Sequence, residues 1–285
     1  MHRNATSIGL LSVLVGLGGI GALPWTAASV ANDVPVATAH TAATRLAPPV
    51  RKAAPVASSS AKKRKPFVAS VVAQPTAAIL PVVDQVGITD NHKKIATAVL
   101  NALPSTCRDN LQTFVVLYKG ATRRGLGGKT TIILDGSVPD EEFAALLVHE
   151  CGHVIHGNMP GTFAAGLSAF ADGPNPFYAD SPVVAFWNVS WKTSASRKAG
   201  KDADFVSGYA KSDPFEEFAE SFAMYVLQRD EFRARAKTND AIAAKLFWFD
   251  ANLPLPDNAV GTGTAGWTGE VPWDVTKLPL TLAAR

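Results

Sequence analysis

The sequence predicts an α+β fold for the part of the chain that can form a core. Two short segments rich in β-branched and aromatic residues, 113–118 and 129–134, precede three helical segments at 140–156, 214–236 and 240–249. Strands that come before the helices, and do not alternate with them, are typical of α+β domains.

Residues 1–31 are expected to form an export signal. A short polar start precedes an uncharged run at 8–23, and Ser29-Val30-Ala31 has the small-x-small pattern of a cleavage site. We therefore expect a secreted or extracellular protein, which stays tethered to the cell surface if the signal is retained.

Residues 32–80 are predicted to be a disordered linker. They are dominated by Ala, Pro, Val and Ser, and seven basic residues against Asp33 give them a net charge of +6, while residues 81–285 carry −4. The KKRK run at 62–65 suggests contact with cell wall or another anionic surface. Nucleic acid is not an expected partner, because no nucleic-acid-binding signature accompanies this run. One folded domain is predicted, at 81–285.

That domain is expected to open with a helix at 90–103, where apolar residues recur every four positions before Pro104. The segments 113–118 and 129–134 then pair as neighbouring strands, and a hairpin is one arrangement, because the glycine-rich RRGLGG between them favours a turn. RRGLGGKT is not a phosphate-binding loop, since Arg123 stands where that motif needs glycine. Nucleotide binding is therefore not expected.

The helix at 140–156 contains the motif HECGH. Each helical residue advances about 100°, so His149 and His153 lie about 40° apart and one turn along, where both imidazoles can reach one ion. Glu150 falls beside them, as suits a base that takes a proton from a metal-activated water. The apolar residues of the helix lie on another side, so the histidine face is not expected to be the core face. The motif predicts one Zn²⁺ ion.

A catalytic zinc generally takes three protein ligands. In the predicted helix 214–236, Glu216 borders the apolar stripe, whereas Glu217 is expected to face away from it. This favours Glu216 as the third ligand and Glu220, one turn on, as the acceptor that orients a ligating histidine. A capping box led by Asp213 is the structural alternative for Glu216.

The two cysteines allow another reading of the site. Export would permit a bridge between Cys107 and Cys151. Alternatively, Cys107 lies upstream of the histidine pair, as the ligating cysteine of peptide deformylases does, which would indicate a non-peptidase zinc amide hydrolase. His156 lies almost two turns beyond His149, too far along a straight helix for the same ion.

These motifs resemble those of the gluzincin metallopeptidases, the group that includes anthrax lethal factor and the Pro-Pro endopeptidases. The resemblance covers about residues 90–250 and lies in HECGH followed by a tyrosine, Tyr209, seven positions before Glu216, which opens an E-x-F-A-E segment that ends at Glu220. It implies a small mixed sheet packed on the HExxH helix and on a following glutamate-bearing helix. It also implies that segment 129–134 is a candidate edge strand for a peptide substrate, although an ordinary strand explains it equally well.

The roles implied by the resemblance fall on five residues. His149, His153 and Glu216 would bind zinc, Glu150 would be the base, and Tyr209 would stabilise the oxyanion. The expected function is a zinc-dependent endopeptidase that acts on proteins or peptides as a monomer.

Two further alternatives stay open, and one expectation concerns the C-terminal tail. Tyr209 could simply pack at a loop end, with Tyr178 of the long segment 157–211 as a substitute donor. The irregular tail at 251–285 is expected to wrap the surface. A surface-binding protein that retains the fold without turnover, with KKRK and its linker as the working parts, is the alternative function.

Overall fold

The computed structural model describes residues 78–255, 260–263 and 272–282. The predicted signal at 1–31 and nearly the whole predicted linker at 32–80 lie outside these residues. The described part is a mixed α+β fold, as the sequence predicts.

The described α-helices are α1 (Asp90–Ala102), α2 (Ser105–Asn110), α3 (Asp140–Gly157), α4 (Pro182–Trp187), α5 (Pro214–Leu227), α6 (Arg229–Ala236) and α7 (Asp240–Asn252). The strands are β1 (Thr113–Leu117), β2 (Gly125–Gly127), β3 (Thr131–Asp135), β4 (Leu167–Asp172), β5 (Asn175–Tyr178), β6 (Trp191–Thr193), β7 (Ser196–Arg197), β8 (Gly261–Gly263) and β9 (Leu280–Leu282). Short 3-10 helices are η1 (Phe163–Ala165), η2 (Asp202–Asp204), η3 (Tyr209–Lys211) and η4 (Val275–Lys277). The segment predicted to be long and irregular, 157–211, thus contains one short helix, two hairpins and 3-10 turns.

Local sequence explains where the main helices begin. The side chain of Thr89 accepts a hydrogen bond from His92 N at the start of α1, and the side chain of Asn239 accepts one from Ile242 N at the start of α7. Asp213 caps α5, and Pro214 follows as its first residue.

The three-stranded sheet has the order β1-β3-β2, and this order corrects two predictions. β1 and β3 run parallel, so the hairpin is wrong, and β3 is the central strand, so segment 129–134 is not the edge. The edge strand is β2, which pairs antiparallel with β3 through Leu126 and Ile133. The glycine-rich segment that favoured a turn is itself a strand, because Gly125 and Gly127 lie close over α3, where a side chain would not fit.

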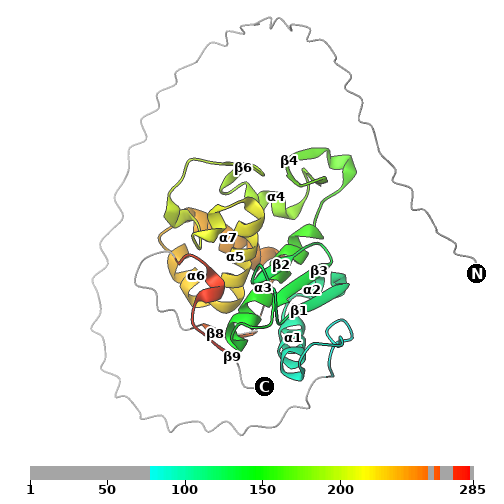
Figure 1. Ribbon diagram of the computed structural model, residues 1–285. Coiled ribbons are helices and arrows are strands. Elements are labelled where there is room, and N and C mark those ends of the chain that lie inside the picture. The colour runs from blue at the N-terminus through cyan, green and yellow to red at the C-terminus, as the bar shows by residue number, and fades with distance from the viewer. Residues whose placement is uncertain (1–77, 256–259, 264–271, 283–285) are drawn as a thin grey trace, which may run out of the picture. The chain divides into compact units, whose positions relative to one another are not determined.

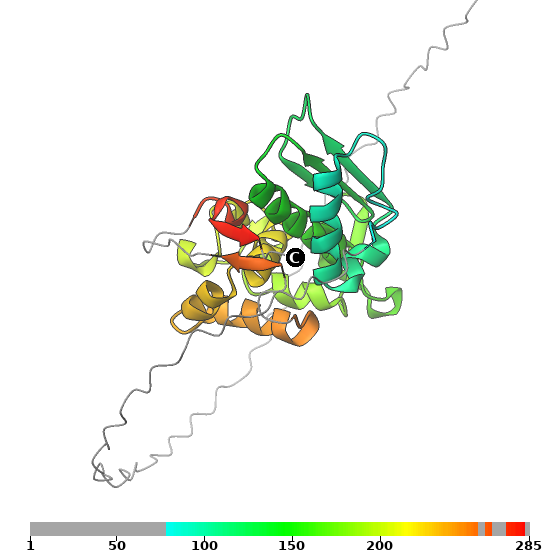
Figure 2. The same ribbon diagram turned by 90° about the horizontal axis from the view of Figure 1, so that it is seen from below.

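Helix α3 lies between the three-stranded sheet and α5 (Figures 1 and 2). Residues 143–152 of this helix are all buried, and His149 and Glu150 are only 5% and 4% exposed. The prediction that the histidine face lies off the core is therefore wrong, because α5 covers that face. Gly152 makes this close packing feasible, since a Cβ there would stand 2.7 Å from Cα of Ala219.

The predicted helix 214–236 is two helices, α5 and α6, with Gln228 between them. The prediction that Glu217 faces away from the packed side is also wrong: it is fully buried. Its carboxylate lies 2.5 Å from Nζ of the equally buried Lys245 and accepts a hydrogen bond from Trp191 Nε1 at 2.8 Å. Helix α5 is thus packed on more than its apolar side, because Lys245 of α7 pairs with the buried carboxylate of Glu217.

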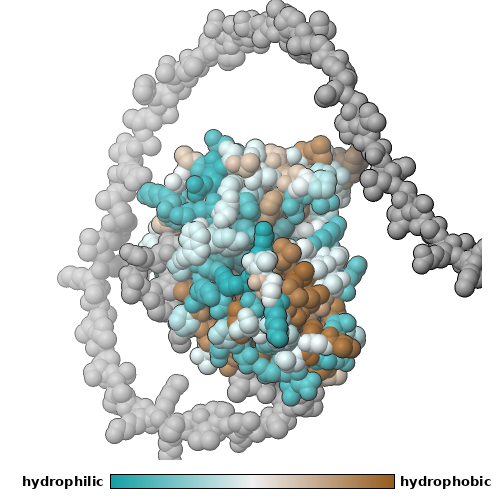
Figure 3. All heavy atoms as spheres, viewed as in Figure 1, coloured by the Kyte–Doolittle hydropathy of each residue, from teal (hydrophilic) through white to brown (hydrophobic). Residues whose placement is uncertain are grey.

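The described parts of the C-terminal segment contain regular structure, whereas the sequence predicted an irregular tail. Strands β8 and β9 pair antiparallel, and η4 packs against both α3 and α5. On the face seen in Figure 3, hydrophobic residues gather over the side where α1 and the three-stranded sheet lie, and hydrophilic residues predominate over α5 and α6. Two exposed hydrophobic side chains, Leu117 and Leu126, belong to that sheet.

Candidate metal centre

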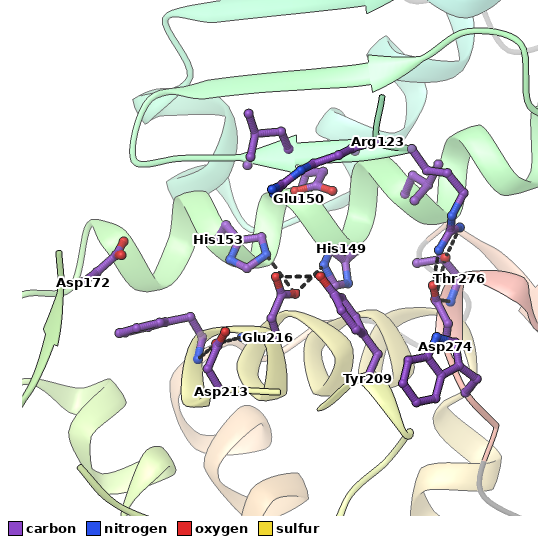
Figure 4. A pocket seen from close by; sticks show the side chains of 17 residues that line it. Arg123, His149, Glu150, His153, Asp172, Tyr209, Asp213, Glu216, Asp274 and Thr276 are labelled. Carbon is purple, nitrogen blue, oxygen red and sulfur yellow. Dashed lines mark hydrogen bonds and ion pairs between the residues drawn. The ribbon is translucent and has the colours of Figure 1, made fainter. Parts of the chain in front are cut away.

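Three polar groups from two helices converge between α3 and α5. Nε2 of His149 lies 3.2 Å from Oε2 of Glu216, and Nε2 of His153 lies 3.4 Å from the same oxygen. All three candidate ligand atoms lie within 4.8 Å of one another. Figure 4 shows the carboxylate of Glu216 rising from α5 toward both rings, which descend from α3.

The spacing and the donor types of these three groups could accommodate a metal ion. Oε2 of Glu216 is buried and has no hydrogen-bond partner among the described residues, although two imidazole nitrogens stand close to it. Ligand atoms that each lie about 2.0–2.1 Å from a tetrahedral zinc are roughly 3.3–3.4 Å apart. The two separations from Oε2 of Glu216 to His149 and His153 match this spacing, and two imidazoles with one carboxylate are a donor set that zinc accepts.

The electrostatics of the cluster favour positive charge. Burial opposes the charged forms, but the neighbouring carboxylates of Glu216 and Glu220 outweigh it and raise the pKa of His149 well above its usual value. Burial likewise opposes ionisation of Glu216, yet the rings of His149 and His153 hold the pKa of this carboxyl far below its usual range. The same carboxylates would stabilise a divalent cation at this position.

Each imidazole has a second contact through its Nδ1. Nδ1 of His149 lies 2.9 Å from Oε1 of the fully buried Glu220, the position that the sequence predicts for an orienting carboxylate. The other oxygen of Glu220 accepts a hydrogen bond from Val275 N at 2.9 Å. Nδ1 of His153 lies 3.1 Å from Nε2 of His156, a contact that the sequence analysis did not predict. A histidine three positions on, one helical turn away, was the available signal.

Glu150 lies on the other side of the histidine pair, beneath the three-stranded sheet (Figure 4). A Cβ on Gly125 would stand 2.0 Å from its Oε1, so only glycine lets β2 pass this close. Burial raises the pKa of Glu150, while the two nearby histidines and a hydrogen bond from Gly127 N–H act in the opposite direction. A carboxylate in this setting can accept and return a proton closer to neutral pH than an exposed one.

Tyr209 joins the site from η3. Its hydroxyl donates a hydrogen bond to Oε1 of Glu216 at 2.9 Å. Burial and the adjacent Glu216 carboxylate raise the pKa of the phenol, so it remains a donor through the neutral range. Tyr178, the substitute donor, is not among the residues that line the pocket.

Capping does not account for the Glu216 side chain. Asp213 accepts hydrogen bonds from the backbone N–H groups of Phe215 and Glu216, as an N-cap does. The carboxylate of Glu216, however, is directed to His149 and Tyr209 and not back to the cap.

A pocket of about 610 Å³ opens over these groups. The C-terminal segment forms one wall through Trp273, Asp274 and Thr276, none of which the sequence analysis selected. Arg124 links this wall to α3. It donates hydrogen bonds to Thr276 Oγ1 at 3.0 Å and to Glu142 of α3 at 2.9 Å, and it forms a short ion pair with Asp274. A second cavity of about 230 Å³ continues past His153.

The cysteines form a disulfide, with Cα atoms 5.4 Å apart. Cys107 is therefore not available as a ligand, which removes the basis for a deformylase-like site. Cys151 follows Glu150 in the motif, so the bridge ties α2 to α3 next to the candidate centre.

Comparison with family models, curated proteins and solved structures finds no match. Within the described residues, no helix has both the length and the apolar character that crossing a bilayer requires.

Proposed function

We propose that this chain is a zinc-dependent endopeptidase that hydrolyses peptide bonds in proteins or peptides. The observation that supports the proposal is the convergence of His149, His153 and Glu216 at zinc-ligand spacing, beside a buried carboxylate and a phenol. These three residues would hold one ion, and bound zinc would supply Lewis-acid polarisation of a carbonyl and acidification of water.

The other residues have roles that follow from their chemistry. Glu150 would take a proton from the attacking water and deliver it to the leaving amine, since burial raises its pKa and both steps need a nearby base and acid. Tyr209 would turn its hydroxyl from Glu216 to the carbonyl oxygen as negative charge develops there.

The edge strand β2 is the proposed docking site for the substrate backbone. Among the described strands it pairs with β3 alone, and Gly125, Leu126 and Gly127 all line the pocket. An extended peptide added to this edge would lie next to the strand that passes over Glu150.

Export and surface attachment complete the proposal. They rest on the signal-like residues 1–31 and the basic linker 32–80, for which cell wall or another anionic surface is the proposed contact. We further propose that the enzyme acts as a monomer.

The decisive experiment measures zinc content and hydrolysis of an unstructured protein by wild type and by Glu150→Gln. We expect the variant to bind one zinc per chain and to lose at least 100-fold in turnover, because the ligands remain while the base is removed. Glu141→Gln alters an exposed carboxylate in the first turn of the same helix and is the matched control. Zinc binding without Glu150-dependent cleavage would favour the surface-binding alternative, and absence of zinc binding would refute the metal centre.

A further inference from the structure

The two histidines of the candidate centre are held by partners of different chemistry. His149 is held by the carboxylate of Glu220 at 2.9 Å, an anionic acceptor. His153 meets the ring of His156, whose Nε2 lies 3.1 Å from its Nδ1. The planes of these two rings are inclined at 75°, so the two rings are not stacked.

The direction of this hydrogen bond follows from the proposed ligation. Nε2 of His153 faces Glu216, so it is the atom available to an ion. A histidine that gives Nε2 to a metal keeps its proton on Nδ1, and that N–H needs an acceptor. The acceptor is then the lone pair on Nε2 of His156, which places the proton of His156 on its own Nδ1.

The surroundings of His156 agree with a neutral ring. It is 2% exposed and lies among four aromatic side chains whose ring centroids are 5.5–6.3 Å away, namely Phe177, Trp187, Phe215 and Phe218. An apolar enclosure disfavours an imidazolium. The neutral ring that results can accept a hydrogen bond from Nδ1 of His153, and it carries no charge that would repel a nearby cation.

Packing alone does not explain a histidine at this position. Nδ1 of His156 is buried and has no hydrogen-bond partner among the described residues. An unpaired buried donor destabilises the folded state, whereas a phenylalanine would fill the same aromatic enclosure without that penalty. The contact with His153 is the feature that a phenylalanine would lose.

We infer that His156 is a positioning residue, which fixes the tautomer and the ring orientation of His153. It is not itself a ligand, because its Nε2 is engaged with His153 and it is not part of the converging group. The inference rests on the proposed zinc site and adds a residue that supports it through a neutral acceptor.

The test compares His156→Phe with His156→Gln in the full chain. Phenylalanine keeps a ring in the enclosure but removes the acceptor, so we expect zinc affinity to fall about 10- to 100-fold. The chelated protein should be as stable as wild type or more so, because the unpaired Nδ1 is gone. Glutamine can place its amide oxygen near the position of Nε2 and should restore the affinity to within about threefold of wild type.

Trp187→Phe is the control for loosened packing. Trp187 is fully buried with its ring 5.8 Å from His156, and its indole N–H has no hydrogen-bond partner among the described residues. Zinc affinity is measured by competition with a chelator, and stability by urea unfolding of the chelated proteins. Histidine ¹⁵N spectra of the zinc-loaded wild type should show both His153 and His156 protonated at Nδ1.

The outcomes separate this inference from the proposed function. Wild type that binds zinc while His156→Phe binds it equally well overturns the inference alone. An equal loss of affinity in Trp187→Phe, or no recovery in His156→Gln, also overturns it, because packing would then account for the effect. A wild type that does not bind zinc overturns both.

Discussion

The close passage of β2 over α3 makes Gly127→Ala a sharp test of the site. A Cβ at this position would lie 2.7 Å from Oε2 of Glu150, 2.8 Å from Cβ of His153 and 2.9 Å from the backbone oxygen of Glu150. Ordinary contact begins at 3.4 Å, so strand and helix must separate by about half an ångström or more. Two of the three neighbours cannot rotate away, because one is backbone and the other is the first atom of a side chain.

The size of this displacement determines the expected loss of activity in Gly127→Ala. A misplacement of about 1 Å at a catalytic group costs roughly 100-fold in rate, so a shift of somewhat more than half an ångström should lower kcat/KM about 10- to 100-fold. That loss corresponds to about 1.4–2.7 kcal/mol of transition-state stabilisation. Zinc affinity should fall by a smaller factor, because His153 is pushed at its Cβ while Glu216 is untouched.

The next residue supplies a matched control. A Cβ on Gly128 would meet only Thr131 O, at 4.0 Å, so Gly128→Ala should leave both activity and zinc affinity near wild type. The assay is kcat/KM on a quenched fluorescent peptide, with zinc titration and thermal unfolding of each variant. Gly127→Ala with activity within twofold of wild type, or Gly128→Ala with an equal loss, would refute the proposed proximity of β2 to the site.

Three further predictions concern stability and pH. Replacing Cys107 and Cys151 with alanine should lower the free energy of unfolding by about 4 kcal/mol in urea titrations, because the bridge closes a loop across 44 residues, and zinc binding should persist. Lys245→Met should cost about 3–5 kcal/mol in the same assay, because it leaves Glu217 charged and unpaired in the core. The acid limb of kcat/KM against pH should lie above the ordinary glutamate range, because Glu150 must be deprotonated to act and burial raises its pKa.

Each of these has an outcome that would contradict it. Loss of zinc binding in the folded double-alanine protein would return Cys107 to the list of candidate ligands. Replacing Glu217 with leucine in the Lys245→Met background should recover much of the stability; no recovery would show that the ion pair is not the source of the loss. An acid limb at or below the range of an exposed carboxyl would show that Glu150 is not the titrating base.

Helices were predictable from local chemistry, whereas the order of strands was not. Local sequence patterns predicted α1, α3 and α7 within a few residues, since such patterns act between neighbours along the chain. The parallel pairing of β1 with β3 depends on β2 taking the edge position beside β3, and no pattern within the strands encodes that position. Glycines favoured a turn at 125–127, but their lack of side chains serves the approach to Glu150 instead.

The candidate site also contains some features that local sequence predicts and others that depend on the fold. Helical geometry alone brings His149 and His153 to one point, and the one-turn spacing of Glu216 and Glu220 does the same on α5. The full burial of Glu217 could not be predicted from its helix, because the cation that pairs with its carboxylate, Lys245, comes from α7. A helical wheel locates the apolar face and does not reveal which polar position another element will cover.

The C-terminal segment is the clearest case of a role that only the fold reveals. Arg124, just before β2, contacts Asp274, a residue 150 positions away. The next residue, Val275, donates its backbone N–H to the carboxylate of Glu220. One short segment is thereby bound both to the strand above the candidate centre and to the carboxylate that holds His149. Because Tyr209 N also donates to the backbone oxygen of the neighbouring Trp273 at 2.7 Å, this segment helps fix the position of the phenol. It follows that the shape of the pocket depends on a part of the chain with no ligand or base of its own.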